Sequence, residues 1–388
     1  MYASLYELFN AWFGIKFEPL KLIHTFGACM AISFFAAAWA LSKELKRKES
    51  EGILKPIPTE RLVGKGATKE ELAEAFVIFF LLFFKLLYII FNFSEAESDI
   101  QGTILSLKGN LLGGVLAGAA YTYYIYREKE KTKLPEPKLE HVLIHPYQLV
   151  SNITLIAAIG GIIGAKLFDA LENYQDFFQD PAMIFSGSGL TIYGGLIVGG
   201  ISVLVYTSKK GIPLLHMVDA AAPAMILAYA IGRIGCQMAG DGDWGIPNPN
   251  PMPGFLSFLP HWMWSFGYPH NVEHAGIAIP GCVGEYCTVL NPGVFPTPFY
   301  ETIMGMIIFF ILWSMRKRIH VAGVLFCWYL VFNGTERFLI ELIRVNIKYH
   351  IFGIDVTQAQ LISPLFFLAG VIGIFYFTNK AKHAEKAS

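Results

Sequence analysis

Arginines and carboxylates interrupt apolar stretches in the second half of the sequence. The segment "VDAAAPAMILAYAIG" leads directly into Arg233, and "NGTERFLIELIRVN" carries Arg337, Glu341 and Arg344. The last three are spaced i, i+4 and i+7, so they share one face of a helix. Because a charged side chain inside a bilayer is costly, such residues mark a functional site by default.

The guanidinium groups predict a site for an anion. Arginine binds phosphate and ester groups through two parallel hydrogen bonds. Because the arginines outnumber Glu341, we expect a net positive pocket, and a phospholipid headgroup is the anion most available at that depth. Glu301, which follows Tyr300 in "PTPFYETI", could orient an arginine or bind a headgroup hydroxyl. The alternative for Arg337 and Glu341 is a salt bridge that only neutralises both partners.

The composition is that of a membrane protein. Of 388 residues, 54% are hydrophobic and 15% are charged, whereas soluble domains have about 25% charged residues. The formal net charge is zero, and no run of basic residues suits a nucleic acid. The sequence therefore predicts an all-α polytopic membrane protein without a nucleic-acid partner. No spacing typical of metal ligands is present, and neither a metal nor a cofactor is expected.

Nine apolar segments are long enough to cross the roughly 30 Å hydrocarbon core of a bilayer as helices. They lie at about residues 20–41, 74–93, 105–126, 148–170, 188–207, 213–236, 298–315, 321–343 and 358–378. Lysines and arginines concentrate in connections 42–73, 127–147, 208–212 and 316–320 and in the C-terminal tail, whereas 94–104, 171–187, 237–297 and 344–357 hold only Arg344 and Lys348. Since basic residues favour the cytoplasmic side, the N-terminus is predicted outside and the C-terminus in the cytoplasm.

Residues 237–297 form the longest connection and contain no lysine or arginine. Their aromatic run "FLSFLPHWMWSFGY" favours the level of the lipid headgroups. We expect an arm or lid on the outer membrane surface, with a passive loop as the alternative. Cys282 and Cys287 lie in this arm, where disulfides persist, and we expect a bridge between them.

Glycine pairs occur in three predicted spans, in "GGVLAG", "GGIIG" and "GGLIVGG". Small residues four apart allow helices to approach closely in lipid. Helix packing is the favoured explanation for them, and a backbone opening for a ligand is the alternative.

Several segments form an ordered set of motifs. They are "IHTFGACM", the pair "IGGIIGAKLFDALEN" and "GLTIYGGLIVGG", then "DAAAPAMILAYAIGRIGCQMAGDGDWG", "PTPFYET" and "ERFLIELIR". Together they resemble the prolipoprotein diacylglyceryl transferase family of the bacterial inner membrane. In that comparison the signature residues would be Arg233, Asp241 and Gly245, the Tyr-Glu motif Tyr300 and Glu301, the late helix Arg337, Glu341 and Arg344, and the first-span motif would include His24.

The resemblance implies an architecture. It implies a seven-span core in the bacterial inner (plasma) membrane, with residues 50–140 as an inserted helical hairpin and cytoplasmic loops. Residues 1–388 would then form one transmembrane domain, with residues 237–297 as a periplasmic arm. The site would open toward the periplasmic side.

The resemblance also implies a reaction. The enzyme would transfer the diacylglyceryl group from phosphatidylglycerol, a membrane lipid, to the lipobox cysteine of a prolipoprotein signal peptide, forming a thioether without a cofactor. Arg233 and Arg337 would stabilise the leaving phosphate, with Tyr193 and Glu341 as further catalytic candidates. The predicted substrate-binding residues are Arg233, His24, Asp241, Gly245, Tyr300, Glu301 and Arg344.

The chain departs from the family pattern at three positions. Tyr193 replaces the usual histidine, Cys236 an asparagine and Phe26 a tyrosine. Tyrosine is a poor base at neutral pH, so we predict that Tyr193 orients the lipid through a hydrogen bond. Glu341, Asp241 and His24 remain candidates to accept the thiol proton.

Two other functions remain open from the sequence. A secondary transporter also places its site near buried charge, although the sequence shows no paired halves. An inactive relative that only binds lipid is the other alternative, because of the changes at Tyr193 and Cys236. Formation of a thioether product would exclude both.

Overall fold

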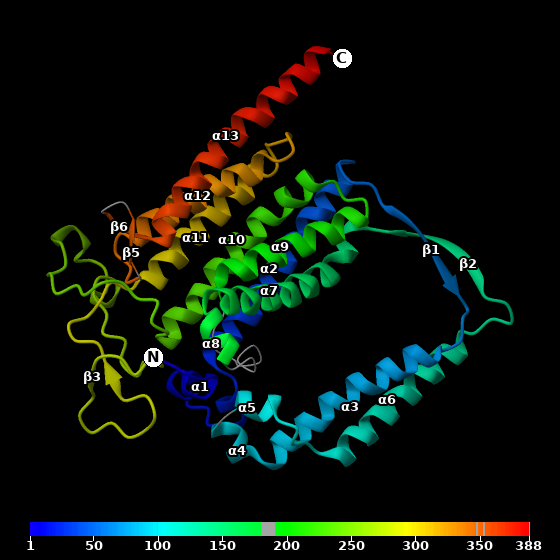
Figure 1. Ribbon diagram of the computed structural model, residues 1–388, viewed down its shortest axis with the longest axis horizontal. Helices are drawn as coiled ribbons and strands as arrows, with labels where there is room; N and C mark the ends of the chain where they lie inside the picture. Colours follow the sequence, from blue (N-terminus) through cyan, green and yellow to red (C-terminus); the bar gives the residue numbers. More distant parts are fainter. Residues whose placement is uncertain (99, 180–190, 347, 352–353, 388) are drawn as a thin grey trace. The chain divides into compact units, whose positions relative to one another are not determined.

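The computed structural model describes residues 1–98, 100–179, 191–346, 348–351 and 354–387, and these are mostly helical (Figure 1). The chain divides into two compact units. Unit 1 comprises Met1–Leu54, Val150–Leu155 and Val203–Ser388, and unit 2 comprises Lys55–Leu149 and Ile156–Ser202. The expected single transmembrane domain stays a prediction.

Unit 1 is built around one central helix, α10 (Leu214–Ala239), which packs against α2 (Thr25–Ser50), α11 (Thr297–Met315) and α12 (Val324–Glu341). The small residues of "DAAAPA" let neighbours approach α10 closely, and α10 is the most buried of the long apolar helices. Helix α13 (Gln358–Ala387) packs along α12. The short amphipathic helix α1 (Leu5–Phe13) precedes them.

Unit 2 contains a helical hairpin, formed by α3 (Lys69–Phe91) and α6 (Leu111–Lys131), which pack against each other. Helices α4 (Phe93–Ser98) and α5 (Ile100–Leu105) connect them. Most of α7 (Val150–Glu172) and the start of α9 (Ile192–Lys209) also belong to this unit, together with α8 (Tyr174–Gln179).

Short strands correct the all-α prediction. Strands β1 (Ile57–Val63) and β2 (Lys138–Ile144) pair antiparallel in unit 2, with Ile57 opposite Ile144. In unit 1, β3 (Ile277–Ala278) pairs with β4 (Thr288–Val289), and β5 (Lys348–Ile351) with β6 (Ile354–Thr357). The single turns of 3₁₀ helix are η1 (Glu18–Leu22), η2 (Pro146–Leu149), η4 (Gly254–Leu256) and η5 (His261–Met263).

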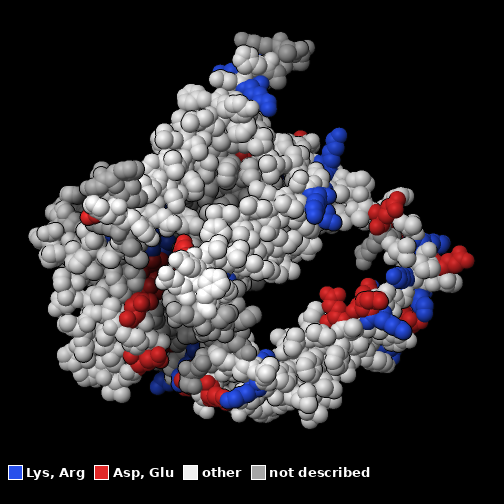
Figure 2. Space-filling view, viewed as in Figure 1, with Lys and Arg blue, Asp and Glu red and all other residues white. Residues whose placement is uncertain are grey.

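The helices support a polytopic membrane protein. A described helix overlaps each of the nine predicted spans, although the start of span 188–207 lies outside the described residues. Six helical segments, in α2, α3, α7, α10, α11 and α13, are long and apolar enough to cross a membrane by length and composition. Most of the visible surface over the helices is uncharged in Figure 2, and charged side chains gather toward helix ends and connections. The span count and the orientation stay predictions.

The glycine pairs serve helix packing, as expected. A Cβ atom built on Gly194 of α9 would lie 2.4 Å from the carbonyl oxygen of Gly164 in α7, and one built on Gly164 would lie 2.3 Å from that of Gly194. Only glycine permits so close an approach of two backbones. In the hairpin, a Cβ on Gly114 or Gly118 of α6 would meet a carbonyl of α3 at 2.9 or 3.0 Å.

The arm between α10 and α11 is folded around buried polar groups. The side chain of Asn271 donates to the carbonyls of Tyr268 (3.1 Å) and Ala275 (3.0 Å) and accepts from the Ala275 amide (2.8 Å). Tyr268 is fully buried, and its hydroxyl donates to Gln237 at 2.7 Å. The predicted disulfide joins Cys282 and Cys287. These contacts favour a shaped arm over a passive loop.

A second group of charges fixes the other ends of the unit 1 helices. Glu44, fully buried on α2, pairs with Arg47 at 2.5 Å and with Arg316 after α11 at 3.1 Å. Asp219 of α10 accepts from the amides of Gly323 (2.7 Å) and Phe326 (2.9 Å) at the start of α12. The carboxylate therefore caps a neighbouring helix, whose first amides would otherwise lack partners.

Candidate active site

Three arginines of unit 1 converge on one carboxylate, Glu301 in the first turns of α11. Its side chain is fully buried. Arg233, near the end of α10, places Nε 3.2 Å from Oε2, and Arg337 of α12 places Nη1 3.1 Å from Oε1. Arg344 places Nη1 3.2 Å from the same Oε1. Charged residues that lie far apart in the sequence thus meet at one point, because α10, α11 and α12 pack together.

Asp243 is the second carboxylate shared by these arginines. One of its oxygens pairs with Arg233 and the other with Arg344. Burial raises the pKa of the Asp243 carboxyl, but the two guanidinium groups outweigh burial and leave this pKa below its usual value. Asp243 is therefore ionised and holds the chain after α10 against the segment after α12.

Glu341 completes the cluster at the end of α12. Its side chain is fully buried, lies 3.5 Å from Nη2 of Arg337 and accepts from Asn346 at 2.7 Å. The expected continuous helical face requires a correction, because α12 ends at Glu341 and Arg344 lies beyond it. The Arg344 side chain still joins the cluster, because its backbone pairs with Gly245.

Gly245 allows this pairing. A Cβ atom there would lie 2.6 Å from the carbonyl oxygen of Ile343 and 2.8 Å from the Cβ of Phe295. Its amide donates to the Phe295 carbonyl at 2.8 Å. The signature glycine thus keeps three segments in contact at the site.

The charge balance differs from the expected net positive pocket. Three arginines, Arg233, Arg337 and Arg344, pair with three carboxylates, Asp243, Glu301 and Glu341. The prediction counted only Glu341 against the arginines and was wrong, because Asp243 and Glu301 reach the cluster from other elements. An anion that enters this site must therefore compete with a carboxylate.

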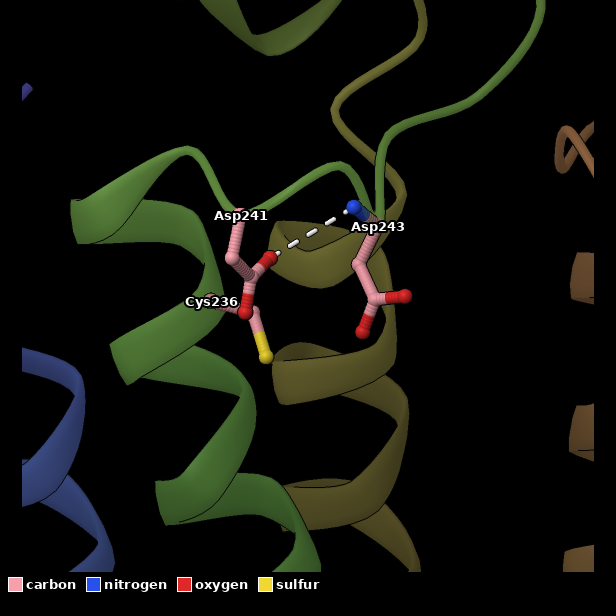
Figure 3. A group of neighbouring side chains, drawn as sticks. All are labelled: Cys236, Asp241 and Asp243. Carbon is pink, nitrogen blue, oxygen red and sulfur yellow. Dashed lines mark hydrogen bonds between the residues drawn. The ribbon is translucent and has the colours of Figure 1, made fainter. Parts of the chain in front are cut away.

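Figure 3 shows Cys236, Asp241 and Asp243, whose ligand atoms lie within 4.8 Å of one another. The Asp241 carboxylate accepts from the Asp243 amide at 3.4 Å (dashed in Figure 3), and burial raises its pKa. This trio fits a metal ion poorly, because the arginines already occupy both oxygens of Asp243. In this turn the carboxylate that pairs with Arg233 is that of Asp243, two residues after the predicted site residue Asp241.

Three further residues were predicted to belong to the site. The Tyr300 hydroxyl donates to the carbonyl of Met263 at 2.6 Å, so it ties α11 to the arm. His24 is exposed at the start of α2, where its backbone pairs with Ser4. Tyr193 lies in unit 2. The substrate-binding roles of Tyr300 and His24 and the catalytic role of Tyr193 stay predictions.

Sequence reasoning missed Tyr229 and Glu336, as well as Asp243. The Tyr229 hydroxyl lies 3.0 Å from Glu301 and 3.2 Å from Glu336, and Tyr229 also packs under the Arg233 guanidinium. Glu336 is another ionisable residue within a predicted span, so its position alone was a signal. Tyr229 precedes Arg233 by four residues and therefore shares its helix face.

These features define a class of protein, a polytopic membrane protein with a buried arginine and carboxylate site at one end of a helix group. The chain belongs to the prolipoprotein diacylglyceryl transferase family, whose family model matches residues 114–376. The matched range begins inside the stretch 50–140 that was expected to be an insertion, so the bounds of that insertion stay a prediction.

Curated relatives support the family assignment. The phosphatidylglycerol–prolipoprotein diacylglyceryl transferase of Clostridium tetani is 30% identical over 230 residues, which cover 59% of this chain and 79% of the relative. The protein of that name from Corynebacterium glutamicum is 30% identical over 245 residues, 62% of this chain and 72% of its own length. The one from Dehalococcoides mccartyi is 27% identical over 254 residues, 62% of this chain and 81% of its own length.

Proposed function

We propose that this protein transfers the diacylglyceryl group of phosphatidylglycerol to the cysteine thiol of a prolipoprotein signal peptide. The sulfur forms a bond to the glycerol carbon, the bond from that carbon to the phosphate oxygen breaks, and glycerol phosphate leaves. Besides the family membership, the main support for this proposal is that Arg233, Arg337 and Arg344 converge on one site. A departing phosphate needs such charge stabilisation.

The lipid phosphate enters by replacing Asp243. Its side chain is 29% exposed, whereas that of Glu301 is fully buried, so Asp243 is the partner that an incoming headgroup reaches. Release of Asp243 frees one nitrogen each of Arg233 and Arg344 for phosphate oxygens. Glu301 keeps the arginines in place as the headgroup binds, because it is the shared partner of all three.

The distribution of charge supports the proposed orientation. The cluster includes the end of α10 and the start of α11, which adjoin the lysine- and arginine-free arm, and the opposite ends of these two helices adjoin basic connections. By the preference of basic residues for the cytoplasm, the proposed site faces outward. Membership in the family supports the proposal that the membrane is the inner (plasma) membrane. The proposed topology has the N-terminus outside and the C-terminus in the cytoplasm.

Reconstitution tests the proposed function. The purified protein is placed in phosphatidylglycerol vesicles with a synthetic prolipoprotein signal peptide, and the peptide product is analysed by mass spectrometry. We expect a mass increase of one diacylglyceryl group and none for a peptide with serine in place of the cysteine. A transporter or a lipid-binding inactive relative yields no such product, and its absence would overturn the proposal.

A further inference from the structure

A tyrosine hydroxyl lies between two buried carboxyl groups behind the arginine cluster. Tyr229 Oη of α10 is 3.0 Å from Glu301 Oε1 of α11 and 3.2 Å from Glu336 Oε1 of α12. Glu301 is 0% exposed and Glu336 is 1% exposed. The three side chains come from three helices that pack against one another, so the arrangement is fixed by the core of unit 1.

The single hydrogen of the Tyr229 hydroxyl determines how many of the two carboxyl groups are protonated. A phenol has one hydrogen and can donate to only one of two neighbouring oxygens. If both carboxyl groups were ionised, one contact would bring two lone pairs together inside a buried site. One carboxyl group therefore carries a proton and donates it to Tyr229.

The arginines identify which carboxyl group is protonated. Glu301 pairs with Arg233, Arg337 and Arg344 and is held as the anion. Arg337, the neighbour of Glu336 in sequence, directs its pairs to Glu301 and Glu341 instead. Within the described chain Glu336 has no ion pair, so it is the neutral acid. The resulting order is Glu336 to Tyr229 to Glu301, with each group donating to the next.

The second oxygen of Glu336 is free to accept another proton. Oε2 is buried and has no hydrogen-bond partner within the described residues. Oε2 of Glu301 and Oε2 of Glu341 also lack a hydrogen bond with good geometry, but each lies within 3.5 Å of an arginine nitrogen. An unpaired buried acceptor costs free energy unless a ligand or water pairs with it. This atom is therefore the unpaired end of the hydrogen-bond chain.

We propose that Glu336, Tyr229 and Glu301 form a proton relay that ionises the substrate thiol, an inference that rests on the proposed function. The thiol gives its proton to Glu336 Oε2, Glu336 gives the proton on Oε1 to Tyr229, and Tyr229 gives its own to Glu301 Oε1. The sulfur retains the electron pair and forms the bond to the glycerol carbon.

The relay balances and ends beside the leaving group. After the transfer Glu336 and Tyr229 are again neutral, and the thiol proton has in effect moved to Glu301. Glu301 pairs with the arginines that are proposed to bind the phosphate, and in the proposed cycle it gives that proton to the departing glycerol phosphate. Each turnover returns all three residues to their starting state, and no further reactant is needed.

Glu336→Gln and Tyr229→Phe test the relay. Glutamine keeps the size, neutrality and hydrogen-bonding ability of the acid but cannot pass a proton onward. At pH 7 we expect each variant to lose about 10²-fold in single-turnover rate, the low end of general acid–base catalysis. Tyr206→Phe on α9 is the control, because it removes a tyrosine hydroxyl that bonds to Asn152 and not to a relay residue, and it should keep the wild-type rate.

A more acidic nucleophile separates the relay from a structural role. A selenol ionises more readily than a thiol, so a peptide with selenocysteine at the reacting position does not need the relay. With that peptide both variants should approach the wild-type rate. Their deficit with the thiol peptide should also shrink as the pH rises toward about 8.5, the ordinary pKa of cysteine. The charged or titratable neighbours of Glu336 are Tyr229 and Arg233 on α10, Glu301 on α11, and Tyr329 and Arg337 on α12.

The outcomes are distinct. If the wild type forms no thioether, the proposed function fails. If the wild type is active but Glu336→Gln matches it at pH 7, or loses equally with both peptides, the relay is wrong. If the variants fail to fold, the relay is tested instead by the solvent deuterium isotope effect on the single-turnover rate of the wild type. It should be larger for the thiol peptide than for the selenol peptide, and equal effects would overturn the relay.

Discussion

Each guanidinium group in this site already has carboxylate partners before any lipid arrives. Arg233 and Arg344 share both Asp243 and Glu301, and Arg337 bridges Glu301 and Glu341. Such pairing offsets the cost of charge within a membrane. The pairing also orients the planar guanidinium groups, so their side chains lose less conformational entropy when a phosphate binds.

At this scale the first prediction concerns Arg337. Arg337→Ala should lower the transfer rate by about 10²- to 10³-fold, because one cation that stabilises the leaving phosphate is lost. Arg337→Lys should restore little of it, since lysine has the charge but lacks the fork. Arg233→Ala should behave in the same way. Arg318→Ala, at an exposed arginine after α11, serves as the control. Near-normal turnover of Arg337→Ala in the reconstituted assay would remove Arg337 from the site.

The second prediction concerns the pH dependence of stability at Asp243. Because its pKa is lower in the folded protein, its ion pairs contribute fully above the unfolded value of about 3.9 and are lost as the pH falls through the folded value. The thermal unfolding temperature of Asp243→Asn should therefore lie below that of the wild type by a constant amount from pH 7 to pH 5. The gap should narrow below about pH 4. A gap that stays constant to pH 3 would contradict the assigned pairing.

The residues of the cluster were only partly predictable. Arg233, Arg337, Glu301 and Arg344 stand out in sequence, because a charge in an apolar stretch is rare and costly. Their common partner Asp243 lies in a glycine-rich turn, where an aspartate is ordinary. Only the fold shows that this turn brings it back between two arginines.

Among the elements, the contact between α7 and α9 depends on the absence of side chains. Gly194→Ala would place a methyl group against a backbone carbonyl that cannot move aside, so we expect destabilisation of about 1–3 kcal/mol. Gly200→Ala on the same helix is the control, because nothing lies within 4 Å of the added atom. Thermal unfolding in detergent measures both. Equal unfolding temperatures would mean that the two helices do not pack through these glycines.

The helices were predictable because a bilayer requires apolar segments of a certain length, and such segments stand out in the hydropathy of the sequence. The pairing of β1 with β2 was not predictable. Its strands lie in polar segments separated by the whole α3 and α6 hairpin, and their pairing is decided by how that hairpin brings its two ends together. Local sequence carries no record of such a long-range register.

In the whole molecule, charged residues of unit 1 lie at two opposite ends of its helices. The arginine and carboxylate cluster adjoins the arm, and the group around Glu44, Arg316 and Asp219 adjoins the basic connections. The apolar middle between them matches the span of a bilayer. This separation, read with the charge rule, is the basis of the proposed orientation.

The last prediction tests that orientation with single added cysteines. Ser257→Cys lies in the arm and Lys317→Cys in the basic connection after α11, and both positions are exposed. The native protein is a suitable background, because Cys282 and Cys287 are bridged and Cys236 and Cys327 are buried. Cys29 is partly buried on α2, and labelling of the unmodified chain controls for its reactivity. A membrane-impermeant maleimide added to intact bacterial cells whose outer membrane has been opened should label Ser257→Cys at once. It should label Lys317→Cys only after the inner membrane is permeabilised. The reverse pattern would place the arm and the arginine cluster on the cytoplasmic side and the basic connections outside, against the charge rule. The proposed outward-facing site would then have to be abandoned.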